Sequence, residues 1–166
     1  MSTLHRRTSP TAGRVIYALL PKGPHGRALC RFCHRECPRD RMTFCGDACV
    51  HEHRLRSDPV YMRECVFARD KGVCAVCKVD TVGLLADLLR RPLKERRRLV
   101  KTLGYPPHRV RGGTLWDADH IVPVAEGGGE CGLENMQTVC VPCHRRKTAV
   151  QGHTRRVTAP TDSRNQ

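Results

Sequence analysis

Residues that can bind metal or transfer protons gather in one short stretch, residues 116–147. It reads WDADHIVPVAEGGGECGLENMQTVCVPCHRRK. A carboxylate beside an imidazole comes first (Asp119, His120), followed by a glycine triplet, Asn135, a Cys-x-x-Cys pair and a second imidazole, His144. Carboxylates and imidazoles are ligands of divalent cations, and an imidazole can also transfer protons near neutral pH. The stretch therefore indicates a metal-dependent catalytic site.

A second Cys-x-x-Cys pair, Cys74 and Cys77, complements the pair Cys140 and Cys143 in this stretch. Together they offer four thiolates, and zinc is the natural metal for a tetrahedral sulfur set. Such a closed site is structural, because it leaves no position for water. The alternative is two unrelated pairs.

The N-terminal third carries another cysteine set. Cys30 and Cys33 are separated by two residues, and Cys45 and Cys49 by three, which suits a second structural zinc. Cys49 is expected at the start of a helix that runs to residue 56, and Phe44 before Cys45 resembles small treble-clef-like fingers. The rival ligands are Cys37, His34, His51 and His53. A cysteine-rich loop without metal is the other alternative.

Composition supports metal as a source of stability. Of the 166 residues, 39% are hydrophobic and only 4% are aromatic, so the apolar core is small, and there are 11 cysteines. No secretory signal and no membrane-spanning segment is visible in the sequence. We therefore expect an intracellular protein, not secreted and without a membrane partner, whose cysteines bind zinc rather than form disulfides.

The chain is strongly basic. Lys and Arg number 30 against 16 Asp and Glu, which gives a formal charge of +14. Because each neutralised phosphate releases a counterion, nucleic acid is the first candidate partner. A basic protein without a nucleic-acid partner is the alternative.

The elements expected around the site are short. Helical periodicity predicts helices over residues 60–70 and 82–103, the second interrupted by Pro92 and ended by Gly104. Strands are predicted over residues 114–124 and 136–141, and a helix over residues 144–150. This order of strand, loop, strand and helix brings His144 close to Asp119 and His120.

A basic insertion separates the two halves of the site. Between Arg90 and Arg111 there are nine Lys or Arg and one acid, Glu95. Three consecutive arginines, Arg96, Arg97 and Arg98, are candidates for contacts with nucleic-acid backbone, and a solvated helix face is the alternative.

Four segments follow from these patterns. Residues 1–28 are predicted to be a disordered basic arm and residues 29–57 an N-terminal zinc finger. Residues 58–150 are predicted to form the domain that carries the candidate site, with residues 82–111 as its basic helical insertion. Residues 151–166 are predicted to be a disordered tail.

The order of these motifs resembles the HNH endonuclease family. His120, Asn135 and His144 are separated by fourteen and eight residues, and Asp119 and the two zinc knuckles accompany them. The match covers roughly residues 66–147, with residues 90–111 outside the common core. The resemblance implies an α+β fold: a small zinc-stapled ββα-metal core, here with an N-terminal zinc finger and a basic helical insertion.

The resemblance also implies roles for individual residues. His120 is expected to be the general base, and Asp119 and His144 are expected to hold one catalytic Mg²⁺ or Mn²⁺. Asn135 is expected to fix the loop and the orientation of His120. Basic residues at the start of the last helix are expected to hold backbone phosphates: Arg145, Arg146 and Lys147.

The implied function is a metal-dependent endonuclease that hydrolyses phosphodiester bonds of double-stranded or branched DNA. The alternative is a non-catalytic zinc-dependent nucleic-acid-binding module, and an RNA-directed nuclease is a further one. Binding alone requires neither the Asp-His pair nor the distant Asn and His, so we prefer the catalytic interpretation. A single site cuts one strand at a time, and we expect a monomer.

Overall fold

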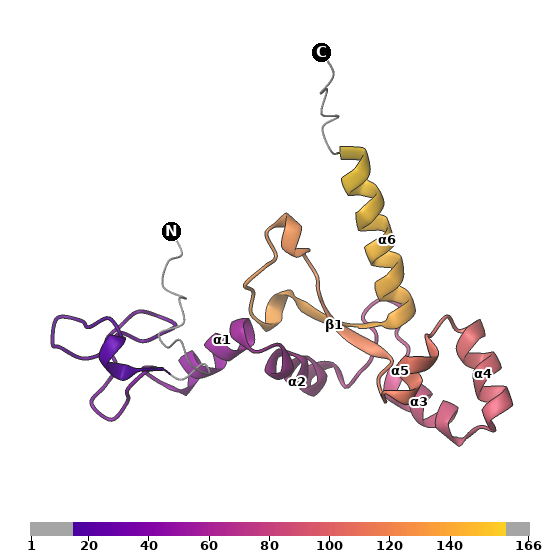
Figure 1. Ribbon diagram of the computed structural model, residues 1–166, viewed down its shortest axis with the longest axis horizontal. Helices are drawn as coiled ribbons and strands as arrows, with labels where there is room; N and C mark the ends of the chain where they lie inside the picture. Colours follow the sequence, from indigo (N-terminus) through magenta and orange to yellow (C-terminus); the bar gives the residue numbers. More distant parts are fainter. Residues whose placement is uncertain (1–14, 159–166) are drawn as a thin grey trace, which may run out of the picture. The chain divides into compact units, whose positions relative to one another are not determined.

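The structure is a computed structural model that describes residues 15–158 (Figure 1). Its contacts divide the chain into two units, Met1–Pro59 and Val60–Gln166, and each is described by itself. The described residues form helices and one two-stranded antiparallel sheet, so the predicted α+β class is confirmed.

The first unit is a loop-rich finger that ends in helix α1 (Asp47–Ser57). A 3₁₀ turn, η1 (Tyr17–Leu19), precedes it. Residues 15–28 belong to the predicted disordered arm, but Leu20 and Ala28 are buried and join the small core of this unit. Backbone hydrogen bonds from Leu29 to Pro21 and from Cys37 to Ala28 hold this segment in place. Residues 1–14 of the predicted arm lie outside the described residues.

The second unit contains the remaining elements: α2 (Pro59–Asp70), α3 (Thr81–Arg90), α4 (Leu93–Thr102), α5 (Pro107–Arg111), β1 (Trp116–His120), η2 (Val124–Glu126), η3 (Leu133–Asn135), β2 (Met136–Cys140) and α6 (Val141–Thr158). The predicted helices over residues 60–70 and 82–103 are confirmed, with Pro92 in the break between α3 and α4. Asp80 caps α3 by accepting hydrogen bonds from the amides of Val82 and Gly83, both at 3.0 Å. None of the helices described here is long and apolar enough to cross a membrane.

The insertion helices are part of the core of this unit. Leu88, Val100 and Val110 of α3, α4 and α5 pack into one cluster with Val139 of β2 and Val141 of α6. The sequence predicted that residues 82–111 form an insertion between the two halves of the site. The structure uses their apolar faces to support the sheet and the start of α6.

Helix α2 is fastened to the sheet through Trp116, which is 7% exposed. The Arg63 guanidinium lies over the indole, with its Cζ 3.7 Å from the ring centroid. It also donates to the Trp116 carbonyl oxygen at 3.0 Å, and Phe67 stacks on the ring at 5.8 Å. Farther along α2, Asp70 accepts the amide of Thr138 at 3.0 Å. These contacts fix the sheet against α2 at both strands.

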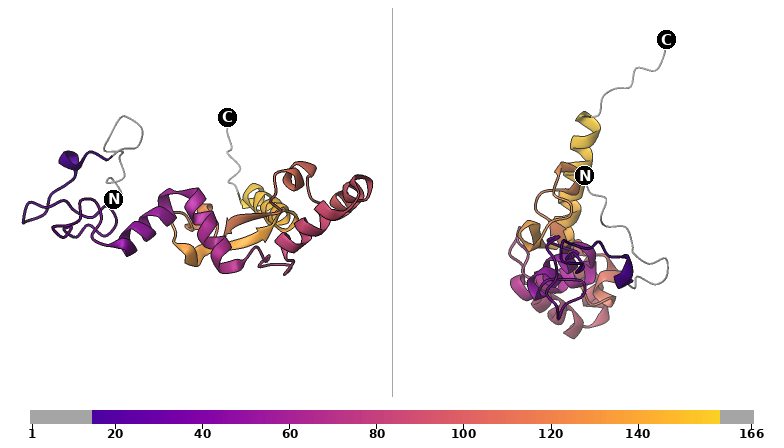
Figure 2. Two further views of the ribbon diagram at one scale, coloured as in Figure 1. Left: turned by 90° about the horizontal axis from the view of Figure 1, so that it is seen from below. Right: turned by 90° about the vertical axis from the view of Figure 1, so that its left-hand side faces the viewer.

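Helix α6 extends beyond its predicted end. The sequence predicted a helix over residues 144–150 and a disordered tail from residue 151, but the helix runs from Val141 to Thr158. The chain has no proline between Pro142 in the first turn and Pro160, so no residue interrupts the helix before that point. Its C-terminal half projects away from the rest of the second unit (Figures 1 and 2). Residues 159–166 lie outside the described residues.

A single side chain closes the loop between β1 and β2. Asn135 Oδ1 accepts the amide of Val122 at 2.8 Å, and its Nδ2 donates to the carbonyl oxygens of Val122 and Gly128 at 3.1 and 2.9 Å. The strand predicted over residues 114–124 therefore ends at His120, because Asn135 takes the polar backbone groups of Val122 out of the ladder. The hydrogen bonds agree with the loop-fixing role expected for Asn135.

Gly128 is needed for this closure. A Cβ atom there would lie 1.8 Å from the Val122 carbonyl oxygen and 2.7 Å from Asn135 Nδ2. Both contacts are far below van der Waals distance, so the backbone would have to move.

We therefore expect Gly128→Ala to disrupt the Asn135 contacts and to lower the free energy of unfolding by about 1–3 kcal/mol. Hydrogen exchange should show lost protection at the Val122 amide. The matched control is Gly129→Ala, whose added Cβ meets the movable Val124 side chain at 3.2 Å. Unchanged exchange in Gly128→Ala, or equal losses in both variants, would contradict this role.

Candidate active site

The structure brings the two distant Cys-x-x-Cys pairs together. The sulfur atoms of Cys74, Cys77, Cys140 and Cys143 all lie within 4.8 Å of one another. The sulfur atoms of Cys77 and Cys140 are 3.6 Å apart, close to the distance of about 3.8 Å expected between two sulfurs bound to one tetrahedral zinc. Because β2 ends at Cys140 and Cys143 lies in the first turn of α6, this cluster joins the knuckle after α2 to the strand and the helix.

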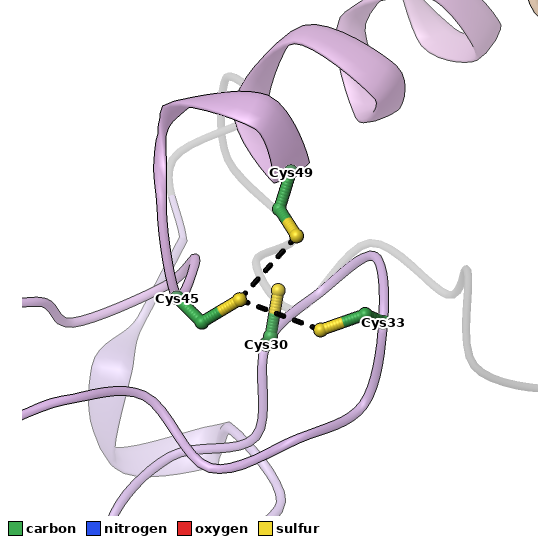
Figure 3. Close-up of side chains that lie close together, drawn as sticks. All are labelled: Cys30, Cys33, Cys45 and Cys49. Carbon is green, nitrogen blue, oxygen red and sulfur yellow. Dashed lines mark hydrogen bonds between the residues drawn. The ribbon is translucent and has the colours of Figure 1, made fainter.

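The second cluster lies in the finger and consists of Cys30, Cys33, Cys45 and Cys49 (Figure 3). The sulfur of Cys45 is 3.4 Å from that of Cys33 and 3.3 Å from that of Cys49. All four cysteines are free thiols. The rival ligands Cys37, His34, His51 and His53 are not members of this cluster.

The electrostatics of both clusters fit a bound cation. A hydrogen bond from Arg35 lowers the pKa of Cys33 to about 6. Burial acts to raise the pKa of Cys74, but hydrogen bonds from backbone amides, first that of Cys140, outweigh it and lower this pKa to about 6. The pKa of Cys49 is raised by its hydrogen bond with Cys45, because crowded thiols resist ionising together. A cation would offset that repulsion.

Asp119 and His144 lie side by side, as predicted. His144 Nε2 is 3.8 Å from Asp119 Oδ1. Two ligand atoms each about 2.1 Å from one hard cation can be at most about 4.2 Å apart. This spacing therefore permits one ion to contact both side chains.

Asp117, the other acid of β1, is a central member of the site. Its Oδ2 is 3.1 Å from Nδ1 of His144, and its Oδ1 accepts a hydrogen bond from Arg109. Burial raises the pKa of Asp117, but the hydrogen bonds from Arg109 and His144 outweigh it and hold this pKa below its usual value. Alternation along β1, which places Asp117 on the same face as Asp119, is the signal that could have identified it.

Lys147 also faces the site. Its ammonium group donates to Asp119 Oδ2 at 2.6 Å and to the carbonyl oxygen of His120. Lys147 lies three residues after His144, so both side chains share one face of α6. In the structure this ammonium pairs with the carboxylate, and the phosphate contact expected for Lys147 stays a prediction.

The imidazole of His120 has no hydrogen-bond partner among residues 15–152, whose side chains are described, and it is half-buried. His120 is the last residue of β1, where it pairs with Met136. Its ring nitrogens are therefore available for proton transfer.

The other predicted basic residues separate into three environments. Arg146 donates to Cys143 Sγ at 2.9 Å and so belongs to the cysteine cluster. Arg96, Arg97 and Arg145 line a common groove, whereas Arg98 is exposed and lies outside its lining.

Comparison with known proteins agrees with this arrangement. The sequence model of the HNH endonuclease family matches residues 107–149. The chain is 36% identical over 149 residues to the mouse "DNA annealing helicase and endonuclease ZRANB3", a match covering 78% of this chain and 14% of that protein. For the human protein the identity is 36% over 122 residues, covering 68% and 11%. The matches thus span about an eighth of the length of these relatives.

The crystal structure of the human ZRANB3 HNH domain is 33% identical to this chain and covers 61% of it, with 98% of that domain matched and a TM-score of 0.47. Together, the family match and the 36% identity to the mouse and human relatives, over 78% and 68% of this chain, confirm the relationship expected from the sequence. This chain belongs to the HNH endonuclease family.

Proposed function

We propose that this protein is a metal-dependent endonuclease that hydrolyses DNA phosphodiester bonds. The observation that carries the proposal is the placement of His144 Nε2 3.8 Å from Asp119 Oδ1, with the imidazole of His120 free at the adjacent strand position. The residues proposed to act are His120 as general base and Asp119 with His144 as ligands of one Mg²⁺ or Mn²⁺.

Asp119 and His144 fit a divalent cation not only by the distance between them but also by the tautomer of His144. Nδ1 of His144 faces Asp117, so a proton on Nδ1 leaves the lone pair of Nε2 directed at the side of Asp119. Carboxylates commonly orient metal-binding histidines in this way. The ammonium of Lys147 pairs with Oδ2 of Asp119 and leaves Oδ1, the oxygen nearest His144 Nε2, for the ion.

Each side chain then has a defined task. When bound, the cation would supply positive charge to the scissile phosphate and to the leaving 3′ oxygen. His120 takes the proton of the attacking water, which contributes about 10²–10⁴ in rate. Asn135 holds the following loop, and Lys147 balances the second oxygen of Asp119.

The two cysteine clusters are proposed to hold structural zinc. Their sulfur spacing fits a tetrahedral ion, and four thiolates leave no coordination position for a substrate. In the finger, where few apolar side chains are buried, zinc would supply much of the folding free energy.

DNA is proposed as the substrate because the formal charge of +14 suits a polyanion and the named relatives are DNA-processing proteins. Action on DNA in turn supports an intracellular location. A helicase activity does not follow, since the matches cover only 11% to 14% of those relatives.

Nicking of supercoiled plasmid should test the catalytic assignment. The wild-type protein should require added Mg²⁺ or Mn²⁺, and His120→Ala should cut about 10²–10⁴ more slowly while its zinc content and DNA affinity persist. The exposed His108 provides the matched control, and His108→Ala should cut normally. Equal cutting by His120→Ala and wild type would exclude His120 as the base. Absence of cutting in all proteins, with DNA binding retained, would favour the non-catalytic module.

Metal analysis should test the zinc assignment. Purified protein should contain about two zinc ions per chain, and Cys45→Ser should contain about one, because it removes a ligand from the finger cluster alone. Cys65→Ser, which alters a cysteine outside both clusters, should retain both ions. A wild-type content near one zinc would remove the finger site.

A further inference from the structure

We propose that a groove between α4, α5 and the start of α6 binds a segment of the nucleic-acid strand next to the phosphate that is cut. This inference rests on the proposed nuclease function and assigns part of its substrate contact. The groove has a volume of about 670 Å³ and lies wholly within the second unit.

Five cations line this groove, and none of its lining residues is acidic. They come from three helices, α4, α5 and α6: Arg96, Arg97, Lys101, Arg111 and Arg145. Convergence of cations from separate segments is costly in the absence of an anion, since like charges repel.

Among residues 15–152, whose side chains the structure describes, these five cations form no ion pair, in contrast to their basic neighbours. Arg90 pairs with Asp87, and Arg91 with Glu95. Arg109 is held by Asp117 in the active site. The acidic side chains of this region thus pair with cations outside the groove. The cations that line the groove remain available for an anion from another molecule.

Arg96 provides a further indication. Its Nε is buried and has no hydrogen-bond partner among the described residues. A buried N–H without an acceptor is destabilising, and an anionic ligand could satisfy it.

The floor between the cations is apolar and includes Val100, Tyr105 and Val110. An ion alone needs no such surface. A nucleic-acid strand does, because it presents phosphates at its edge and sugar and base faces between them. The groove therefore fits a strand better than a free phosphate.

Arg145 connects the groove to the active site. It follows His144 directly in α6, and it is the member of the groove that lies nearest in sequence to the candidate metal ligand. A strand with its scissile phosphate at His144 and Asp119 has to continue past this turn of the helix. Continuity with the site favours the substrate strand over an acidic protein as the occupant.

The test is binding of fluorescent DNA oligonucleotides, single-stranded and duplex, measured by anisotropy between 50 and 300 mM salt. The full chain carrying His120→Ala is used without added Mg²⁺, so that cleavage does not interfere. Arg97→Ala should lower affinity on the order of ten-fold near 100 mM salt and reduce the slope of log K against log salt by about 1. Combining it with Lys101→Ala should reduce the slope by about 2.

Arg98→Ala is the matched control, because Arg98 is adjacent on α4 and exposed but does not line the groove. It should keep the parental affinity and slope. Arg97→Lys, which retains the charge, should also keep the slope. Zinc content and circular dichroism confirm folding of every variant.

Wild-type-like affinity and slope in the groove variants, or an equal loss in Arg98→Ala, would overturn the proposal. Binding of a labelled poly-glutamate peptide that depends on Arg97 and Lys101, with DNA binding unaffected, would assign the groove to an acidic protein instead. Nicking by the chain with His120 intact is measured in parallel. If it fails while the groove variants lose DNA affinity, the proposed catalysis fails and the groove assignment stands.

Discussion

The candidate site depends on the four-sulfur cluster of Cys74, Cys77, Cys140 and Cys143. Its members come from the knuckle after α2, the end of β2 and the first turn of α6. Because Cys143 is fixed in that cluster, the rotation of α6 is fixed as well, and His144 is directed at β1. The antiparallel register places Trp116 opposite Cys140, which brings the acidic face of β1 beside the same helix.

Basic and acidic side chains alternate where β1 faces α6. Arg109 holds Asp117, Asp117 orients His144, and Lys147 holds Asp119. Each acid is therefore matched by a base before any ion arrives, and this keeps two carboxylates on one short strand without strong repulsion. The groove that Arg145 lines has the opposite character, since its cations have no ion pair among the side chains that the structure describes.

The two cysteine clusters, the helices of residues 60–70 and 82–103, and the meeting of Asp119 with His144 were predictable from the sequence. Spacing and periodicity are local signals, and cysteine pairs reveal distant contacts because their chemistry allows few partners. The contacts of Asp117 with His144 and of Lys147 with Asp119 were not predicted, because each depends on which face of β1 meets which face of α6. The end of β1 at His120 was also missed, since it is set by the tertiary contacts of Asn135 with Val122 and Gly128.

The central claim is that the cluster positions Asp119 and His144 to share one divalent cation. The most direct measurement is anomalous diffraction from crystals of the His120→Ala protein soaked in Mn²⁺. The account predicts a manganese peak within about 2.5 Å of both Asp119 Oδ1 and His144 Nε2. Manganese bound at full occupancy only at other positions would contradict it. So would the absence of a peak between these two side chains in a crystal saturated with Mn²⁺.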